Sequence, residues 1–115
     1  MFRQILDEGI VICAGSDSAL TPVNPLLGIY SAVNHPKKDH AVTLIEAIKM
    51  FTSSAAYATF SESERGSIAR GKKADLTVLD KDIQKVNPES IKDISVDITI
   101  REGRIVYSRN REELL

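Results

Sequence analysis

Three side chains in this sequence have the chemistry of acid–base or metal sites: Asp17, His35 and His40. Asp17 closes the segment I-V-I-C-A-G-S-D, in which a β-branched apolar run stops at a glycine, a serine and a carboxylate. Apolar residues at successive positions are typical of a strand buried on both faces of a parallel sheet. Such sheets carry their chemistry at the carboxyl ends of the strands. The position of Asp17 therefore predicts a catalytic acid or base.

The same three residues are candidate ligands for a zinc ion, because a catalytic zinc site takes three protein ligands and a water molecule. The two histidines, however, lie in the loop N-H-P-K-K-D-H, where neither helical nor alternating spacing aims their rings. The sequence thus disfavours a native metal site built from Asp17, His35 and His40 alone. Asp17 also has a structural interpretation, since Asp and Ser after a strand commonly cap a turn by accepting backbone N–H bonds.

Composition excludes several classes of protein. The 115 residues include 15 basic and 16 acidic side chains, so no electrostatic bias toward nucleic acid is expected. A single cysteine rules out an internal disulfide framework, and Cys13, inside the apolar run, is expected to be a buried small hydrophobe. The sequence shows neither a secretory signal nor a run of the ~20 apolar residues that cross a membrane. We expect a cytoplasmic protein without membrane or nucleic-acid partners.

The first half of the chain is predicted to hold one strand and three helices. Residues 1–8 repeat apolar side chains at helical spacing and end at a glycine, and residues 10–14 form the apolar strand. Asn24 and Pro25 suit the cap and first position of a short helix that stops before Pro36. A capping box, T-L-I-E, then opens a helix predicted over residues 44–58.

The second half changes to the alternating period of strands. One short strand is predicted near Ile68 and another over residues 74–79. Residues 96–101 and 104–108 are predicted to form a hairpin around Glu102-Gly103. A two-residue turn would place Ile100 opposite Ile105 and Ile98 opposite Tyr107, whereas a three-residue turn with a bulge would shift the register by one.

Four motifs in order resemble the carboxyl-terminal end of an amidohydrolase-superfamily hydrolase. They are G-S-D-S with N-P-L-L-G-I-Y-S-A-V, T-L-I-E-A-I-K-M-F-T-S-S-A-A-Y-A, R-G-S-I-A-R-G-K-K-A-D-L-T-V-L-D, and D-I-T-I-R-E-G-R-I-V-Y. The likeness is to the long-chain subgroup that includes N-substituted formamide deformylases. It implies an α+β fragment: the last strand and helices of an incomplete TIM barrel over residues 1–60, part of a small β-sandwich over 61–110, and a tail over 111–115.

The resemblance also implies a role for Asp17. In complete members of the family, the aspartate that ends the eighth barrel strand contacts the metal, zinc or another divalent ion, and takes a proton from the metal-bound water. The family's histidine ligands belong to earlier strands that have no counterpart in this sequence. The resemblance therefore implies a truncated hydrolase of C–N bonds that is inactive and without cofactor on its own.

Two alternatives to this inactive fragment are kept. The chain could be one subunit of a split hydrolase completed by the missing N-terminal polypeptide, or a non-catalytic oligomeric interaction module. A barrel strand cut from its companions exposes apolar surface, and at roughly 25 cal/mol per Å² a few hundred Å² of such surface is worth several kcal/mol. We therefore expect a homo-oligomer, in particular a dimer, or a partner chain that covers this surface.

Overall fold

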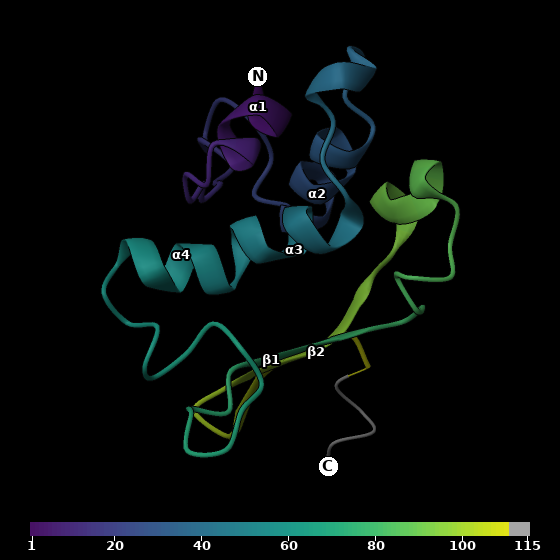
Figure 1. The fold of residues 1–115 in the computed structure, drawn as a ribbon. Helices are drawn as coiled ribbons and strands as arrows, with labels where there is room; N and C mark the ends of the chain where they lie inside the picture. The colour runs from purple at the N-terminus through teal and green to yellow at the C-terminus, as the bar shows by residue number, and fades with distance from the viewer. Residues whose placement is uncertain (111–115) are drawn as a thin grey trace.

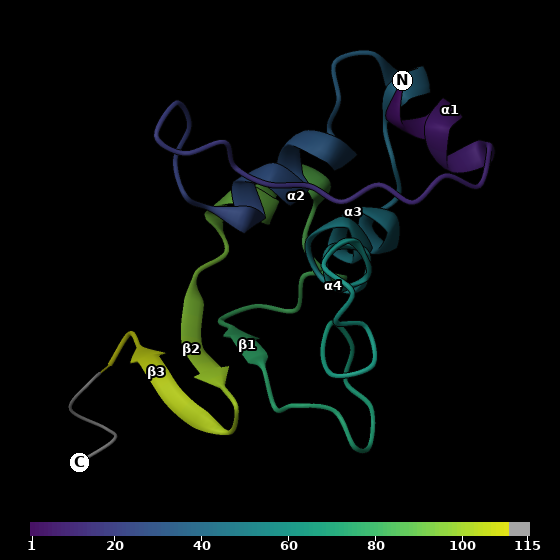
Figure 2. The same ribbon diagram turned by 90° about the vertical axis from the view of Figure 1, so that its left-hand side faces the viewer.

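The helices gather at one end of the molecule, and a three-stranded sheet lies at the other end (Figures 1 and 2). The computed structural model describes residues 1–110, so the predicted tail over 111–115 lies outside the described residues. The helical elements are α1 (Phe2–Asp7), α2 (Pro25–Val33), α3 (Leu44–Phe51) and α4 (Ser53–Ala58), with 3₁₀ turns η1 (Lys38–His40) and η2 (Pro88–Asp93). Strands β1 (Leu76–Leu79), β2 (Val96–Arg101) and β3 (Arg104–Ser108) form an antiparallel sheet in the order β1-β2-β3. The described chain is a small α+β domain.

Helix α2 begins as its sequence predicts. The side-chain oxygen of Asn24 accepts a hydrogen bond from the backbone N–H of Leu26 at 3.1 Å, and Pro25 occupies the first helical position. Proline suits this position because its missing N–H would have no helical partner there. The predicted cap and start of α2 are confirmed.

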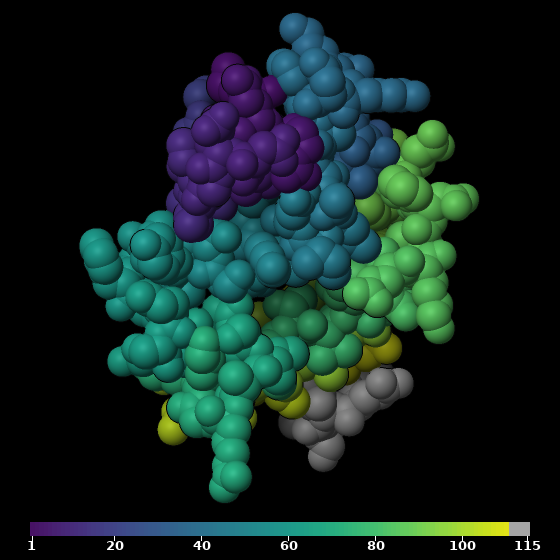
Figure 3. Space-filling model, in the orientation of Figure 1, coloured from purple at the N-terminus to yellow at the C-terminus, as the bar shows by residue number. Residues whose placement is uncertain are grey.

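The capping box of α3 also binds the first helix. Thr43 Oγ1 accepts from the N–H of Glu46 at 3.2 Å, and a Glu46 carboxylate oxygen accepts from the N–H of Thr43 at 2.8 Å. The same oxygen, Oε2, lies 2.7 Å from the Arg3 guanidinium of α1, which also binds Asp7. In the space-filling view α1, in purple, lies against the blue and teal helical segments (Figure 3).

The buried core belongs to the helical end. Its buried members are contributed by α2, α3, η2 and the residue before the capping box: Ile29, Ala32, Val42, Ala47, Met50 and Ile91. The predicted apolar face of α3, through Leu44, Ile48 and Phe51, packs around this cluster as partly buried side chains. No residue of the three strands belongs to the cluster. The sheet is therefore not part of the main core.

The helix predicted over residues 44–58 is interrupted at Thr52. This residue leaves the helical region, with φ −128° and ψ −93°, and separates α3 from α4. Its hydroxyl donates a hydrogen bond to the carbonyl of Ile48 at 2.8 Å. Threonine side chains that bind a carbonyl one turn earlier compete with the helical ladder and bend helices. The prediction of one continuous helix was therefore wrong at this residue.

The predicted strand over residues 10–14 is not a strand in the structure. Its backbone makes two hydrogen bonds with helices: the N–H of Ile10 donates to the carbonyl of Ile5 in α1 at 3.2 Å, and the N–H of Ala14 donates to the carbonyl of Met50 in α3 at 3.0 Å. Side chains still alternate along it: Ile12 and Ala14 pack against the core, while Val11 is 53% exposed. A strand exists only when a neighbour completes its hydrogen bonds, and residues 1–110 provide no such neighbour. For the same reason Cys13, predicted to be buried, is exposed.

The predicted hairpin between β2 and β3 is present, and of the two turns that its sequence left open it has the two-residue one. Glu102 and Gly103 have φ values of +49° and +77°, as a type I′ turn requires at both central positions. Ile100 lies opposite Ile105 as predicted, but a register shift follows, so that Tyr107 lies opposite Thr99 rather than Ile98. The predicted pairing of Ile98 with Tyr107 was wrong, because a bulge moves the side chains of one strand relative to the other.

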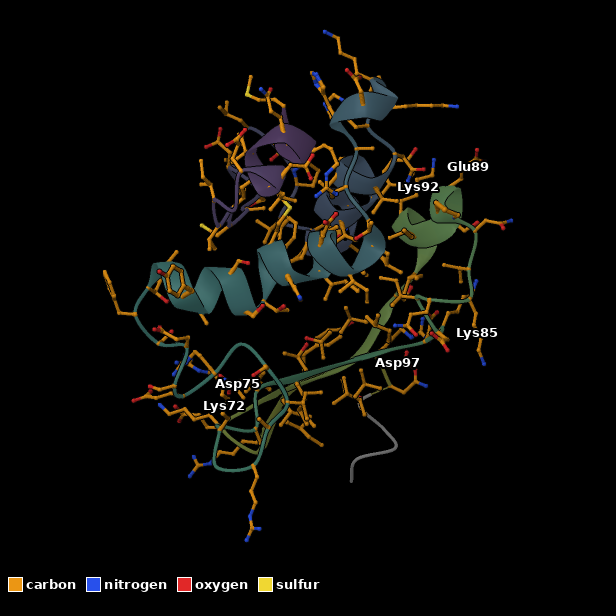
Figure 4. The ribbon with its side chains drawn as sticks, viewed as in Figure 1. Lys72, Asp75, Lys85, Glu89, Lys92 and Asp97 are labelled. Atoms are coloured by element: carbon orange, nitrogen blue, oxygen red, sulfur yellow. The ribbon has the colours of Figure 1, made fainter. Side chains whose placement is uncertain are left out.

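The strand predicted near Ile68 is a loop, and Ile68 is 90% exposed. The loop is held by Lys72, which is labelled in Figure 4. Its ammonium donates to the carbonyl of Glu62 at 2.7 Å and to Ser67 Oγ at 2.8 Å. Gly66 brings the loop against α4, since a Cβ at this position would lie 2.6 Å from the Ala56 Cβ. Bonds to the lysine replace the strand pairing that the alternating pattern suggested.

Over residues 1–110, no helix is long and apolar enough to cross a lipid bilayer.

We predict that Glu46→Gln weakens the contact between α1 and α3. The hydrogen bonds from Arg3 and Thr43 hold the pKa of Glu46 at about 2, well below the ordinary value of 4.5. Because this pKa is lowered in the folded chain, the stabilisation is complete above about pH 4.5 and disappears as the pH falls toward 2. Chemical denaturation should show a loss of about 1 kcal/mol at pH 6. The difference from wild type should vanish near pH 2, and the exposed control Glu62→Gln should show neither effect.

We predict that Gly66→Ala destabilises the chain much more than Gly71→Ala. Both glycines have left-handed backbones, with φ +93° and +87°, but a Cβ at Gly71 meets no atom within 4 Å. A non-glycine residue in this conformation costs about 1–2 kcal/mol, and only Gly66→Ala adds a clash with α4. Thermal unfolding of the two variants separates backbone strain from steric contact. Equal losses of stability would contradict a close approach at Gly66.

Candidate functional site

Asp17 lies on an exposed loop with a left-handed backbone, at φ +53°. The carbonyl of Asp17 accepts from the N–H of Leu20 at 3.1 Å, and Ser16 Oγ accepts from the N–H of Ser18 at 3.3 Å. The side-chain cap of this turn is therefore made by Ser16. Within residues 1–110, the Asp17 carboxylate takes part in no side-chain hydrogen bond or ion pair. Its oxygens remain available to an external group.

The backbone of Asp17 is a local source of strain. Asp tolerates the left-handed region better than most residues, yet the region still costs free energy for any side chain. Strained residues of this kind concentrate at active sites and ligand-binding turns. An exposed carboxylate on a strained turn, with the capping role held by its neighbour, favours a functional over a purely structural interpretation.

The loop of Asp17 is anchored to the helical core three residues earlier. Ala14 donates its N–H to the carbonyl of Met50, near the end of α3, and the Ala14 side chain packs against the core. After Ala14, the chain turns away into exposed residues. The helical core thus fixes the point at which the loop that carries Asp17 begins.

The two histidines lie together, but they do not belong to a group of three side chains that could hold a metal ion. The ring centroids of His35 and His40 are 5.3 Å apart, and Phe2 of α1 meets His35 edge-on at 5.8 Å. His35 Nδ1 lies 3.1 Å from the N–H of Lys37, and His40 Nε2 lies 3.8 Å from Asp39. Residues 1–110 contain no group of three or more His, Cys, Asp or Glu side chains that could hold a metal ion. The structure therefore does not assemble Asp17, His35 and His40 into a metal site.

An open depression of about 540 Å³ borders the histidine loop. Its polar lining comes from α2, the following loop and η2: Tyr30, Asn34, His35, Lys38, Glu89 and Lys92. The Lys92 ammonium lies 5.2 Å from the centre of the Tyr30 ring, and Figure 4 shows Glu89 and Lys92 side by side on η2. Asp17 does not line this depression. Sequence reasoning missed this polar cluster because its residues are far apart in the chain and carry no local motif.

The comparison with family models decides the family. The model of the amidohydrolase family matches residues 1–107. The chain belongs to the amidohydrolase family. The resemblance seen in its four motifs is thereby confirmed.

Curated relatives of this amidohydrolase-family chain are several times longer. The amidohydrolase-type protein YtcJ of Bacillus subtilis is 34% identical over 95% of the chain, and the N-substituted formamide deformylase of Arthrobacter pascens is 32% identical over 93%. The matched regions cover 22% and 21% of these two proteins. The chain therefore spans about a fifth of the length of the curated relatives it matches.

Solved structures of the superfamily share the fold. An amidohydrolase from Thermotoga maritima aligns with 95% of the chain and 27% of its own, at a TM-score of 0.73 and 23% identity. A 5-methylcytosine deaminase from Klebsiella pneumoniae aligns with 93% of the chain and 27% of its own, at a TM-score of 0.66 and 21% identity. An enamidase aligns with 95% of the chain and 30% of its own length, at a TM-score of 0.65 and 21% identity. At these identities the likeness establishes the fold alone.

We predict that Asp17→Asn leaves the stability of the chain within about 0.5 kcal/mol of wild type. Asparagine tolerates the left-handed backbone as aspartate does, and the carboxylate has no partner within residues 1–110. Asp17→Val should instead destabilise the chain, since a β-branched residue fits this conformation poorly. Urea unfolding of both variants tests the difference. A large loss of stability in Asp17→Asn would show that the carboxylate supports the fold.

Proposed function

We propose that this chain is the carboxyl-terminal part of a metal-dependent hydrolase of C–N bonds, in which Asp17 accepts and returns a proton. The observation that carries the proposal is an exposed carboxylate without a partner on a strained turn, in a chain of the amidohydrolase family. Similar proteins are named for chemistry at carbon–nitrogen bonds, including a formamide deformylase and a deaminase. General acid–base groups of this kind typically contribute about 10²–10⁴-fold to a rate.

Residues 1–60 are proposed to form the last strand and helices of an incomplete (β/α)₈ barrel, and residues 61–110 part of a small β-sandwich. The alternating but unpaired segment over residues 10–14 supports this, because its Ile12 and Ala14 side chains meet helices while its backbone lacks strand neighbours. Neighbouring barrel strands would complete those hydrogen bonds. Asp17 would then follow the carboxyl end of a barrel strand, where barrel enzymes place their reacting groups.

The chain does not fit a metal on its own. Within residues 1–110 no three ligand-type side chains come together, and the histidine pair lies in a loop flanked by lysines. The metal ligands of the proposed enzyme other than Asp17 therefore belong to a polypeptide segment other than this one. The contribution of this chain is limited to the position of Asp17 and the availability of its carboxylate for proton transfer.

A second candidate function is a non-catalytic oligomeric module. Large apolar side chains at the surface favour it, among them Leu20, Val23, Phe60 and Ile68, which are 86%, 77%, 92% and 90% exposed. Single exposed apolar side chains are common, and it is a contiguous apolar patch that marks an interaction site. This alternative needs no chemistry from Asp17.

Complementation separates the two functions. The chain would be produced together with the part of the Arthrobacter pascens N-substituted formamide deformylase that precedes the matched region, with zinc in the medium. Release of formate from an N-substituted formamide would be measured. We expect turnover that requires both polypeptides. Asp17→Asn should lower the rate by at least about 10²-fold without preventing assembly.

The matched control is Asp39→Asn, which removes an exposed carboxylate beside His40 rather than at the strained turn. It should leave turnover unchanged. A complex that assembles but hydrolyses no amide, or one whose rate is insensitive to Asp17→Asn, would contradict the proposed hydrolase and favour the oligomeric module.

A further inference from the structure

Helix α3 ends in carbonyl groups whose hydrogen-bond donors come from outside the helix. The last four carbonyls of an α-helix have no intrahelical N–H to bind. In α3, the carbonyl of Ile48 accepts from the Thr52 hydroxyl at 2.8 Å, and the carbonyl of Lys49 accepts from the Thr52 N–H at 3.1 Å. The carbonyl of Met50 accepts from the N–H of Ala14 at 3.0 Å. Thr52 therefore satisfies two of these carbonyls, and Ala14 satisfies a third.

The Met50 carbonyl is available to Ala14 because α3 ends before Thr52. In an uninterrupted helix this carbonyl would accept from the N–H of Ser54, four residues later. Thr52 stops the helical pattern, since its backbone has φ −128° and ψ −93°, and it occupies the cap position before α4. The break therefore directs one backbone acceptor of the helical core toward the segment that leads to Asp17.

The backbone around the break is closely packed. A Cβ at Gly66 would lie 3.1 Å from the Cα of Ser53 and 3.2 Å from the carbonyl oxygen of Thr52, so the second half of the chain meets the break directly. Met50 is 3% exposed, and the Ala14 side chain packs against the buried core. The hydrogen bond between Ala14 and Met50 thus starts from a well-packed part of the molecule.

A short piece of chain connects this hydrogen bond to the carboxylate. Asp17 follows Ala14 by three residues, and three residues span at most about 11 Å. The backbone and side-chain hydrogen bonds of the Asp17 turn described above lie within residues 16–20. The bond from Ala14 to Met50 is therefore what ties the start of this turn to the core.

We propose that Thr52 is a positioning residue for Asp17. Its hydroxyl ends α3 at the point where the Met50 carbonyl can bind Ala14, and this bond sets where the Asp17 turn begins. Threonine suits the role because its hydroxyl can bind a carbonyl one turn earlier and its branched side chain has few rotamers. The effect of Thr52 on turnover rests on the proposed hydrolase function, whereas its effect on the Ala14 N–H does not.

Amide hydrogen exchange of the 115-residue chain, followed by nuclear magnetic resonance, is the first test. Thr52→Val removes the hydroxyl and keeps the branched shape, whereas Thr52→Ser keeps the hydroxyl. Thr52→Val should speed exchange of the Ala14 N–H by at least about 10-fold relative to the Ala47 N–H, which reports on opening of the whole core. The Ala47 N–H binds the Thr43 carbonyl at 2.9 Å. Thr52→Ser should exchange as the wild type does.

The matched control is Thr59→Val. The Thr59 hydroxyl donates to the carbonyl of Ala55, also one turn earlier, at 3.2 Å and at the far end of α4. This variant should leave exchange at Ala14 unchanged. Equal acceleration at Ala14 and Ala47, equal effects of Thr52→Val and Thr59→Val, or no effect of Thr52→Val would overturn the proposal.

A measurement on the wild-type chain does not depend on whether the variants fold. A scalar coupling across the hydrogen bond is expected between the Ala14 nitrogen and the Met50 carbonyl carbon. A coupling from the Ser54 nitrogen to the Met50 carbonyl carbon in its place would show that the helix continues through Thr52, and the proposal would fail.

Turnover of the two-polypeptide complex tests the consequence for Asp17. Thr52→Val should lower kcat by at least about 10-fold with KM unchanged, because a small displacement of a reacting group is costly. Thr52→Ser and Thr59→Val should keep the wild-type kcat. An active complex whose kcat is insensitive to Thr52→Val would overturn the positioning role. A wild-type complex without turnover would instead contradict the proposed hydrolase, and exchange at Ala14 would then decide the role of Thr52.

Discussion

The arrangement of the helical end depends on one carboxylate. Glu46 closes the capping box of α3 and binds Arg3 of α1. One side chain therefore both accepts from the Thr43 N–H at the start of α3 and connects two helices. Both sets of bonds are strongest with the charged form, since an ionised carboxylate is the better acceptor. Helix α1 has only six residues and no buried residue of its own. An isolated helix of that length is unstable in water, so its position depends on this pairing and on the contacts of Phe2 and Leu6 with the core.

The two ends of the molecule differ in how completely they are packed. The helices share a core of buried side chains, whereas the sheet is joined to them by connecting loops and presents its aliphatic residues outside that core. The anchoring of Ala14 to Met50 gives the Asp17 turn a fixed starting point, while the turn itself is open. The same fold therefore combines a packed helical core with surfaces that the described residues leave open. This combination agrees with a chain that spans about a fifth of the length of its curated relatives.

Local chemistry was predictable where it is decided within a few residues. The Asn24 cap, the Thr43–Glu46 capping box and the Glu102-Gly103 turn follow from side chains that bind nearby backbone groups, and all three are present. The break at Thr52 arises because its hydroxyl binds the carbonyl of Ile48 in competition with the helical backbone bonds. The spacing of apolar residues carries no information on this competition. The position of Asp17 after an apolar run was readable from sequence, but its left-handed backbone and its separation from the histidine pair depend on the path of the chain in three dimensions. Strand pairing at 10–14 needs a neighbouring strand, and residues 1–110 provide none, so the local pattern alone could not establish it.

The exposure of Cys13 has a practical consequence for studying this chain. The thiol lies four residues before Asp17, in the segment without strand neighbours, and it is the single cysteine of the sequence. Alkylating reagents reach a solvent-accessible thiol and are blocked when another backbone or side chain covers it. The rate at which Cys13 is alkylated therefore measures how accessible this segment is to solvent, and no substitution is needed for the measurement. A lower rate in the presence of a second polypeptide would show that the segment before Asp17 is covered.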